Sequence, residues 1–531
     1  MAKADEKEGY EHDVQVDDSR STLQETQNGR VQQQDHEKGH VVGDNGQGLI
    51  TTKQKDSTGF TERDWQLEKQ VLRKLDWTVL PLAALIYLLS FLESVYPPGE
   101  SCLACSHSVC SQSLEYKDLK LDSHQYLVVI TVTYVPYIAA ELPSNLLLKV
   151  VGPNVLIPGL VTAWGVTTTL TGLVQSYPGL IAARFFLGLL EGGIFPGLVL
   201  YLSGFYRRRE LQTRISLFFS AASLSGAFSG LLAAGIVSGM RGLTSLAAWR
   251  YIFIFEGIVT VVVGVACFFL LPRTPEQAYV LNAEQKAHVK RRLALDSPPG
   301  ATSEESFSWI EVGRAFTSPH VLLLFCALFG NGVTLYGLSY FTPSIVQTFG
   351  WSTTRTQLMT VPPFVGAFFV TMFNARLADK YGYRGACVIS MSLVSIIGYA
   401  IFFARADRWS RYGAMFPQII GAYSTAPALV TWLPANSARH YRRATAVALG
   451  FVATNSGGIC STWLFPQTEA PQYRRATIVN IAMACVTALF ALVNLLYLLR
   501  ENKKKESRKM LATAETWNEE GDRHPSFKYS Y

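Results

Sequence analysis

Charged residues are scarce in this chain of 531 residues. Asp, Glu, Lys and Arg make up 16% of it, against roughly 25% in an average soluble protein, whereas 49% of the residues are hydrophobic. The hydrophobic residues crowd into the stretch from Trp77 to Leu499. This pattern excludes a fibrous or wholly disordered chain, disfavours a soluble multidomain enzyme and indicates a membrane protein.

Cysteine is rare as well, and eight residues are too few for a disulfide scaffold. The first sixty residues contain no apolar run, so no secretory signal peptide is expected and the first apolar helix should act as its own insertion signal. Residues 1–62 are rich in Gln, Asp, Glu, Lys and Gly, and they bury too little apolar surface to fold alone, which predicts a disordered cytosolic tail.

About twelve apolar runs are long enough to cross the ~30 Å of hydrocarbon in a bilayer. They lie near residues 77–95, 124–148, 154–174, 178–204, 214–238, 249–271, 320–342, 356–376, 386–404, 411–433, 443–465 and 476–499. Segments such as 257–271 are apolar on every side. Helices of a soluble protein would instead show an apolar stripe on one side, so these segments indicate membrane helices.

The sequence therefore predicts an all-α membrane protein with twelve transmembrane helices in two pseudo-symmetric six-helix bundles. The bundles are expected at 63–272 and 320–500, with a cytosolic loop at 273–319 and a cytosolic tail at 501–531. Residues 283–295 of the loop have the pattern of a short, basic, solvated surface helix. Lys and Arg gather at alternate ends of the apolar runs, which places both termini in the cytosol and suits the plasma membrane.

Ionisable side chains inside a membrane cost ~2.5–3.5 kcal/mol on insertion scales and indicate function by default. Four draw attention: Glu93, Arg184, Glu191 and Glu256. Arg184 and Glu191 are seven residues apart, on nearly the same helical face, so a cation and an acid could bind an anion and relay a proton. A buried pair that only locks helices together is the alternative, and Glu256 is interpreted as structural.

Uncharged polar residues gather in the second half of the apolar region. They are Asn331, Thr334, Tyr336 and Tyr340 in the seventh run, Tyr423, Ser424 and Thr425 in the tenth, and Asn455 and Ser456 in the eleventh. If these helices line a cavity, such side chains supply hydrogen bonds to a polar solute. Hydrogen bonding between helices is the competing interpretation.

The connection between the eighth and ninth runs, residues 374–385, is short, charged and contains glycine. Such a hairpin suits a hinge. Asp379 could accept hydrogen bonds from the N-terminus of a neighbouring helix, while Lys380 and Arg384 face lipid headgroups. An ordinary positively charged cytosolic loop is the alternative.

Recognisable sequence begins in the fourth run. Arg-Phe-Phe-Leu-Gly at 184–188, followed by Leu-Leu-Glu-Gly-Gly-Ile-Phe-Pro-Gly at 189–197, resembles the major facilitator superfamily and, more narrowly, the fungal anion:cation symporters, which include the allantoate permeases. Further matching segments are 205–211, 218–230, 249–257, 358–363, 377–385, 441–446 and 500–504. Over roughly 65–505 the resemblance implies two six-helix bundles, rocker-switch alternating access and uptake of organic anions with protons. Substrates in that family include allantoate, nicotinate, biotin and pantothenate.

Two features bear on how closely the chain follows this family. The fifth run has Ser-Gly-Ala-Phe-Ser-Gly at 225–230 without the Gly-Pro pair of drug exporters, which favours a symporter. The first run lacks the family's Arg and Asn-rich segment after the acidic position at Glu93. Residues 94–116 instead carry Cys102, Cys105, Cys110 and His107. They are either an outer loop, with a disulfide or, on weaker grounds, a metal set, or the product of a mis-assigned exon boundary.

The sequence thus predicts a secondary transporter that moves a small organic anion, such as a carboxylate, vitamin or ureide, together with protons. The predicted solute-binding residues are Arg184, Asn331, Tyr336, Tyr340 and Asn455, the proton carriers Glu191 and Glu93, and the gating residues Asp379, Lys380 and Arg384. We expect a monomer in the lipid bilayer that needs no cofactor beyond the proton gradient, no metal and no nucleic acid. No cluster of catalytic residues supports an enzyme. Export of a fungal secondary metabolite and a non-transporting nutrient sensor are the alternatives.

Overall fold

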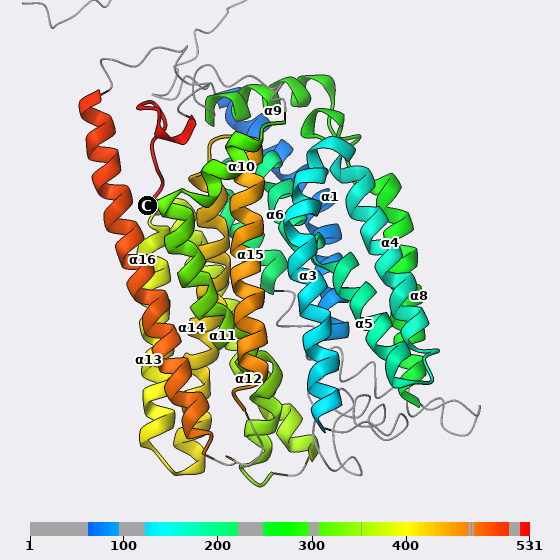
Figure 1. Ribbon diagram of the computed structural model, residues 1–531. Helices are drawn as coiled ribbons and strands as arrows, with labels where there is room; N and C mark the ends of the chain where they lie inside the picture. The colour runs from blue at the N-terminus through cyan, green and yellow to red at the C-terminus, as the bar shows by residue number, and fades with distance from the viewer. Residues whose placement is uncertain are drawn as a thin grey trace, which may run out of the picture. The chain divides into compact units, whose positions relative to one another are not determined.

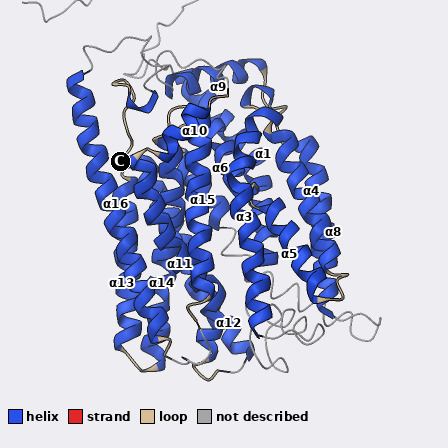
Figure 2. Cartoon of the chain, in the orientation of Figure 1, coloured by secondary structure: helices blue, strands red, loops and turns tan. Residues whose placement is uncertain are grey.

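The computed structural model describes residues 62–94, 123–220, 248–296, 307–351, 353–465, 469, 472–508 and 521–531 (Figure 1). All of them belong to one compact unit of the chain, residues 55–531. The described residues form helices and connecting turns, with no β-strand among them, which confirms the predicted all-α fold (Figure 2).

The helices of the N-terminal half precede a short connecting region. They are α1 (Glu62–Ser94), α3 (Ser123–Val151), α4 (Pro153–Thr171), α5 (Tyr177–Glu191), α6 (Ile194–Phe205), a helix described over residues 211–220, and α8 (Ala248–Leu270). The connecting region holds η1 (Pro275–Gln277), α9 (Ala283–Asp296) and α10 (Trp309–Phe316).

The C-terminal half holds six long helices and a short turn. They are α11 (Pro319–Gln347), α12 (Thr353–Tyr381), α13 (Arg384–Ala404), α14 (Arg408–Ala435), α15 (His440–Thr462), α16 (Arg474–Arg508) and η5 (Gly521–Arg523). Each of the twelve predicted spans coincides with helix, although most of the fifth lies outside the described residues. Six described stretches meet a strict length and hydropathy test for crossing a membrane: 177–205, 250–270, 319–347, 358–381, 384–404 and 474–508.

Prolines inside these helices do not end them. α14 contains Pro417, Pro427 and Pro434 and remains helical throughout. The carbonyl groups that these prolines free lie four residues earlier, at Gly413, Tyr423 and Val430. Neighbouring helices and Ser or Thr side chains can satisfy such freed backbone groups, which is why membrane helices tolerate proline.

The two halves meet where α15 packs against α3 and α6 (Figure 1). Within the halves, the closest partners are α4 with α8, α13 with α14, and α11 with α15 and α16. α9, α10 and the segment 521–531 lie at one end of the helices, which we name the α9 face; the opposite end is the far face (Figure 1).

α9 occupies the position predicted for a surface helix, but it is not fully solvated. Glu68 of α1, itself 5% exposed, accepts hydrogen bonds from the α9 residues His288 (Nε2–Oε2, 2.6 Å) and Arg292 (Nη1–Oε1, 3.0 Å). Arg292 also pairs with Glu210 at 2.7 Å. His288 and Arg292 therefore attach one face of α9 to the first turns of α1. These turns precede the apolar run that begins at Trp77.

Close approach of α3 and α5 depends on glycine. A Cβ atom at Gly188 would overlap the carbonyl oxygen of Thr133, and one at Gly192 would overlap that of Tyr137. Small residues at such contacts let helix backbones pack against each other in membranes. Gly204 of α6, in contrast, has no atom within 4 Å of the corresponding position.

We therefore expect Gly192→Val to destabilise the protein, whereas Gly204→Val should leave it unchanged. Overpacking of a tight contact costs about 1–3 kcal/mol, because backbones must separate to admit the side chain. Thermal unfolding of the purified protein in detergent, followed by tryptophan fluorescence, measures the difference. Equal melting temperatures for the two variants would show that this contact does not constrain the fold.

Candidate functional site

A small cavity lies between the two halves of the molecule. Its volume is about 30 Å³, which leaves room for a water molecule or two. The lining comes from α1, α3, α6, the helix at 211–220, α11, α14 and α15, and consists of Tyr87, Tyr137, Phe195, Phe219, Leu328, Asn331, Leu335, Tyr336, Ala426, Val430, Phe451 and Thr454. Both halves of the molecule thus contribute residues to the lining of this cavity.

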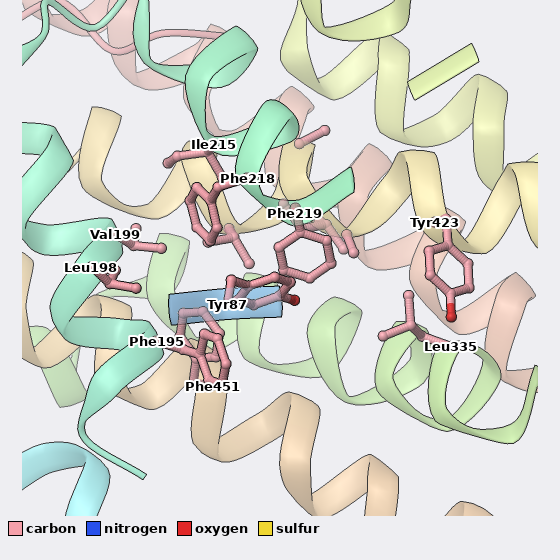
Figure 3. Packing of buried hydrophobic residues seen from close by; sticks show 14 of the residues in the cluster. Tyr87, Phe195, Leu198, Val199, Ile215, Phe218, Phe219, Leu335, Tyr423 and Phe451 are labelled. Carbon is pink, nitrogen blue, oxygen red and sulfur yellow. The ribbon is translucent and has the colours of Figure 1, made fainter. Parts of the chain in front are cut away.

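Aromatic packing forms the wall on the N-terminal side. The ring of Tyr87 lies edge-on to Phe195 (centroids 4.5 Å apart) and to Phe218 (5.2 Å), and it also contacts Phe219 (5.2 Å). Figure 3 shows these rings together with Phe451 of α15. Edge-to-face contacts between aromatic rings are favourable, so the rings of this wall stabilise one another.

Asn331 of α11 is the polar group of the cavity that most clearly lacks a partner. Its side chain is 2% exposed, and its Nδ2 has no hydrogen-bond partner among the described residues. Leaving a buried donor unsatisfied costs about 1–3 kcal/mol. The structure therefore places this predicted solute-binding residue where an acceptor atom of a ligand would satisfy it.

A chain of hydrogen bonds crosses between the halves beside the cavity. Asn455 Nδ2 on α15 donates to Oε1 of Glu141 on α3 (2.5 Å), and the Tyr336 hydroxyl on α11 donates to Asn455 Oδ1 (2.7 Å). The two partners fix the orientation of the Asn455 amide, because a carboxylate accepts and the phenol donates. Glu141 is 0% exposed, and its Oε2 has no described partner.

Glu141 is absent from the residues that the sequence singled out. The cost argument that selected Glu93, Arg184, Glu191 and Glu256 applies to it equally, since it is the single acid in the apolar run 124–148. Its neighbours Ala139 and Ala140 and the following Leu142-Pro143 give it no local motif, and the pairing with Asn455 is visible only in three dimensions.

Tyrosines join the halves on the far-face side of this chain. The hydroxyl groups of Tyr134 on α3 and Tyr340 on α11 are hydrogen-bonded to each other. The ring of Tyr336 stacks on Tyr340 (centroids 5.8 Å apart) and meets Tyr134 edge-on (6.0 Å). Three of the predicted solute-binding residues, Tyr336, Tyr340 and Asn455, therefore belong to one cluster.

Glu191 lies near this cluster and Arg184 does not. Glu191 ends α5, is 5% exposed and interacts electrostatically with the hydroxyls of Tyr137 and Tyr340. The Arg184 guanidinium instead lies 5.6 Å from the ring centroid of Phe253 on α8, and its Nε has no described partner. Arg184 is not among the cavity-lining residues. The side chain of Glu93, like Cys102, Cys105, His107 and Cys110, lies outside the part of the chain that can be described.

At the α9 face, the hairpin between α12 and α13 reaches across to the N-terminal half. The Asp379 carboxylate accepts backbone N–H groups of Gln212 (3.3 Å) and Thr213 (2.7 Å), at the start of the helix that begins at residue 211. A carboxylate is favoured at that position because the N-terminus of a helix carries partial positive charge. This is the contact that the sequence suggested for Asp379.

The prediction that Arg384 faces lipid headgroups is wrong. Arg384 is 2% exposed; its Nε donates to Gln212 Oε1 (3.2 Å), and one Nη donates to the Arg208 carbonyl oxygen. The acceptors supplied by the other half keep the guanidinium buried. Lys380 is exposed, as contact with headgroups would require, and its Nζ lies 5.3 Å from the centroid of the Tyr381 ring.

The segment Gly521–Tyr531 adds to this contact. Ser530 exchanges hydrogen bonds with Asn436 at the end of α14 (N–Oδ1, 2.7 Å; Nδ2–O, 3.0 Å), and its hydroxyl accepts from Arg384 Nη1 (3.1 Å). From the N-terminal half, the Arg208 guanidinium lies 4.2 Å from the centroid of the Phe527 ring. The segment therefore contacts both halves at the α9 face.

Known proteins share this architecture. The Major Facilitator Superfamily matches residues 78–462. Among solved structures, the proton:xylose symporter XylE superposes with a TM-score of 0.57 at 14% identity, over 80% of this chain and 95% of that one. A bacterial homologue of the human lysosomal transporter Spinster, in an inward-facing conformation, gives 0.52 at 15% identity, over 79% and 96%.

Similarity in sequence extends along most of the chain. An uncharacterized transporter of Schizosaccharomyces pombe is 33% identical over 86% of this chain and 87% of its own length. The high-affinity nicotinic acid transporter of Saccharomyces cerevisiae is 30% identical over 90% of this chain and 87% of its own. An MFS-type transporter of Penicillium expansum is 28% identical over 91% and 96%. With the helical architecture and the cavity between two halves, these matches establish that the chain is a multi-pass membrane transporter that belongs to the major facilitator superfamily.

Proposed function

We propose that the chain is a secondary transporter of a small organic anion, carried together with protons by alternating access. The observation that carries the proposal is the buried hydrogen-bond chain from Glu141 through Asn455 to Tyr336, which links the two halves next to the cavity. An ionisable group so placed inside a membrane is costly unless it has a function.

Charge balance supports coupling to protons. The lining of the cavity includes the donor Asn331, and Tyr336, whose hydroxyl donates to Asn455 in this structure, but no Lys or Arg among the described residues. Two carboxylates that share a buried site cannot both be ionised. An anion would therefore enter when Glu141 is protonated, with its charge held by neutral donors. Return of the empty carrier would follow release of that proton.

Similarity to the nicotinic acid transporter of Saccharomyces cerevisiae supports a small carboxylate as the solute. Together with the motif at 184–197, it supports the narrower assignment to the fungal anion:cation symporters, the family of the allantoate permeases. The α9 face carries Arg207, Arg208 and Arg209 and the basic helix α9, so we assign it to the cytosol, and the membrane to the plasma membrane. One chain supplies the whole cavity, so a monomer suffices, with the proton gradient as its energy source.

Uptake measurements in a host that lacks its own permeases test this proposal. Labelled nicotinate, allantoate and other small carboxylates should accumulate, and more so in acidic medium, because the inward proton gradient drives symport. Purified protein in proteoliposomes separates the alternatives. A nutrient sensor would show no counterflow of labelled solute. An exporter that exchanges solute for protons would accumulate solute when the proton gradient points outward instead of inward.

Glu141→Gln should uncouple transport from the proton gradient. The amide imitates a permanently protonated carboxyl group, so solute counterflow should persist within a few-fold, while accumulation driven by a pH gradient should fall to the level of protein-free liposomes. Glu276→Gln is the matched control, because Glu276 is exposed and lies outside the cavity. Accumulation by Glu141→Gln at the unmutated rate would remove Glu141 from the coupling mechanism.

Asn331→Ala should weaken solute binding by roughly tenfold, since one hydrogen bond to a charged group contributes about 1.5 kcal/mol. The half-saturation concentration for uptake measures this loss. Arg184→Ala, made alongside, tests the cation predicted from the sequence. If Arg184 organises the site through α5 and α8, the variant should reach the cell surface normally but show no uptake. Normal transport by the variant would exclude a role for Arg184 in solute binding.

Arg384→Gln should favour opening at the α9 face, because it removes the guanidinium that reaches Gln212 and Arg208. Spin labels at positions 209 and 503, both exposed on this face in opposite halves, would report a larger population of long distances. Asp379→Asn should act in the same direction. Lys380→Gln is the control, since among the described residues the ammonium group of Lys380 contacts the neighbouring Tyr381 ring and no group of the N-terminal half. A distance distribution unchanged in Arg384→Gln would argue against a gate here.

A further inference from the structure

A second cavity lies at the α9 face, away from the transport site. Its volume is about 240 Å³, and it is enclosed by α10, the start of α11, α15, α16 and the segment 521–531. Four arginines line it: Arg314, Arg442, Arg508 and Arg523. The one acid in its lining is Asp522.

Two of these arginines already have acidic partners. Arg442 binds Glu311 through Nε (2.9 Å) and Nη2 (2.7 Å) and also pairs with Asp522, while Arg314 Nη1 binds Glu311 at 2.7 Å. Arg508 and Arg523 are exposed, and the described residues offer neither of them a hydrogen bond or an ion pair. Arg439 also pairs with Glu311 (3.2 Å), so five arginines share two acids, Glu311 and Asp522, and the cavity carries excess positive charge.

The neutral groups of the cavity are also donors. Ser318, the N-cap of the 29-residue helix α11, makes no side-chain cap hydrogen bond, so the partial positive charge of that helix end is open to the cavity. Burial raises the pKa of the Tyr529 hydroxyl well above its ordinary value, so this group stays neutral and can donate without adding negative charge. Each of these contributions favours an anion.

We propose that this cavity binds a phosphate-bearing anion. A guanidinium group binds two phosphate oxygens at once through charge-assisted hydrogen bonds. The guanidinium groups of Arg508 and Arg523, which have no described partner, together match the double charge of a phosphate monoester better than the single charge of a carboxylate. The apolar part of α16 ends near Leu499, and Arg508 lies nine residues further on, or about 13 Å along the helix axis. That position lies beyond the ~5–8 Å of the headgroup region, so a soluble phosphate compound has direct access, and a lipid reaches it with a phosphorylated headgroup that projects outward from the membrane surface.

Occupancy would act on the gate as well. Asp522, Arg523 and Tyr529 belong to the segment whose Ser530 holds Arg384 and whose Phe527 contacts Arg208. A bound phosphate group would join this segment to α10 and α16 and so steady the contacts that close the α9 face. The binding site itself does not depend on the proposed transport function.

Binding to the full-length protein tests the inference. One arm uses nanodiscs of phosphatidylcholine with or without a minor fraction of phosphatidylinositol 4-phosphate, and the other uses inorganic pyrophosphate in solution; ligand-induced change in melting temperature and direct titration are the readouts. Response to the lipid alone identifies a headgroup, and response to pyrophosphate identifies a soluble ligand. Failure of both probes would overturn the proposal.

The double variant Arg508→Gln/Arg523→Gln should lose at least about tenfold in affinity for whichever probe binds, since two charge-assisted contacts disappear. Its melting temperature without ligand should not change, because neither side chain has a described partner. Arg209→Gln/Lys290→Gln is the control; it removes the same charge from exposed positions elsewhere on the α9 face. Equal affinity of the two double variants would overturn the assignment of this cavity.

Discussion

A carboxyl group buried between the two halves is the constraint on which the rest of the structure depends. Glu141 has no exposed surface, and its described partner is an amide on the opposite half. An ionised carboxylate there is stabilised by one hydrogen bond, which cannot replace its hydration. The protein can hold this carboxyl group neutral or pair it with a ligand. Leaving it ionised and unpaired would cost free energy. The proposed coupling to protons rests on this choice.

Contacts on both sides of this group keep the described conformation closed. Toward the far face, the Tyr134 and Tyr340 hydroxyls join α3 to α11; toward the α9 face, Asp379 and Arg384 join the α12–α13 hairpin to the N-terminal half. Alternating access requires these two sets to break in turn. Each set consists of a few hydrogen bonds, so a ligand with differential affinity can shift the balance between conformations.

Much of the fold could be predicted from the sequence, because an apolar run long enough to cross a bilayer leaves the chain little choice but a helix. The sequence also marks Tyr336, Tyr340 and Asn455 as polar residues on two apolar runs, with cavity lining and hydrogen bonding between helices as alternatives, and the structure shows hydrogen bonds between helices at all three. Contacts between distant segments were not predicted: the burial of Arg384 depends on acceptors at Arg208 and Gln212, and the attachment of α9 depends on Glu68. Glu141 was missed although the cost argument covered it, and Arg184 lies against α8 because its helix face is set by packing.

Proton uptake on solute binding tests the central claim most directly. Titration calorimetry of the purified protein with its solute, repeated in buffers of different ionisation enthalpy, gives the number of protons taken up per anion bound. The account predicts about one proton for the unmutated protein and none for Glu141→Gln. Binding without proton uptake in the unmutated protein would contradict it.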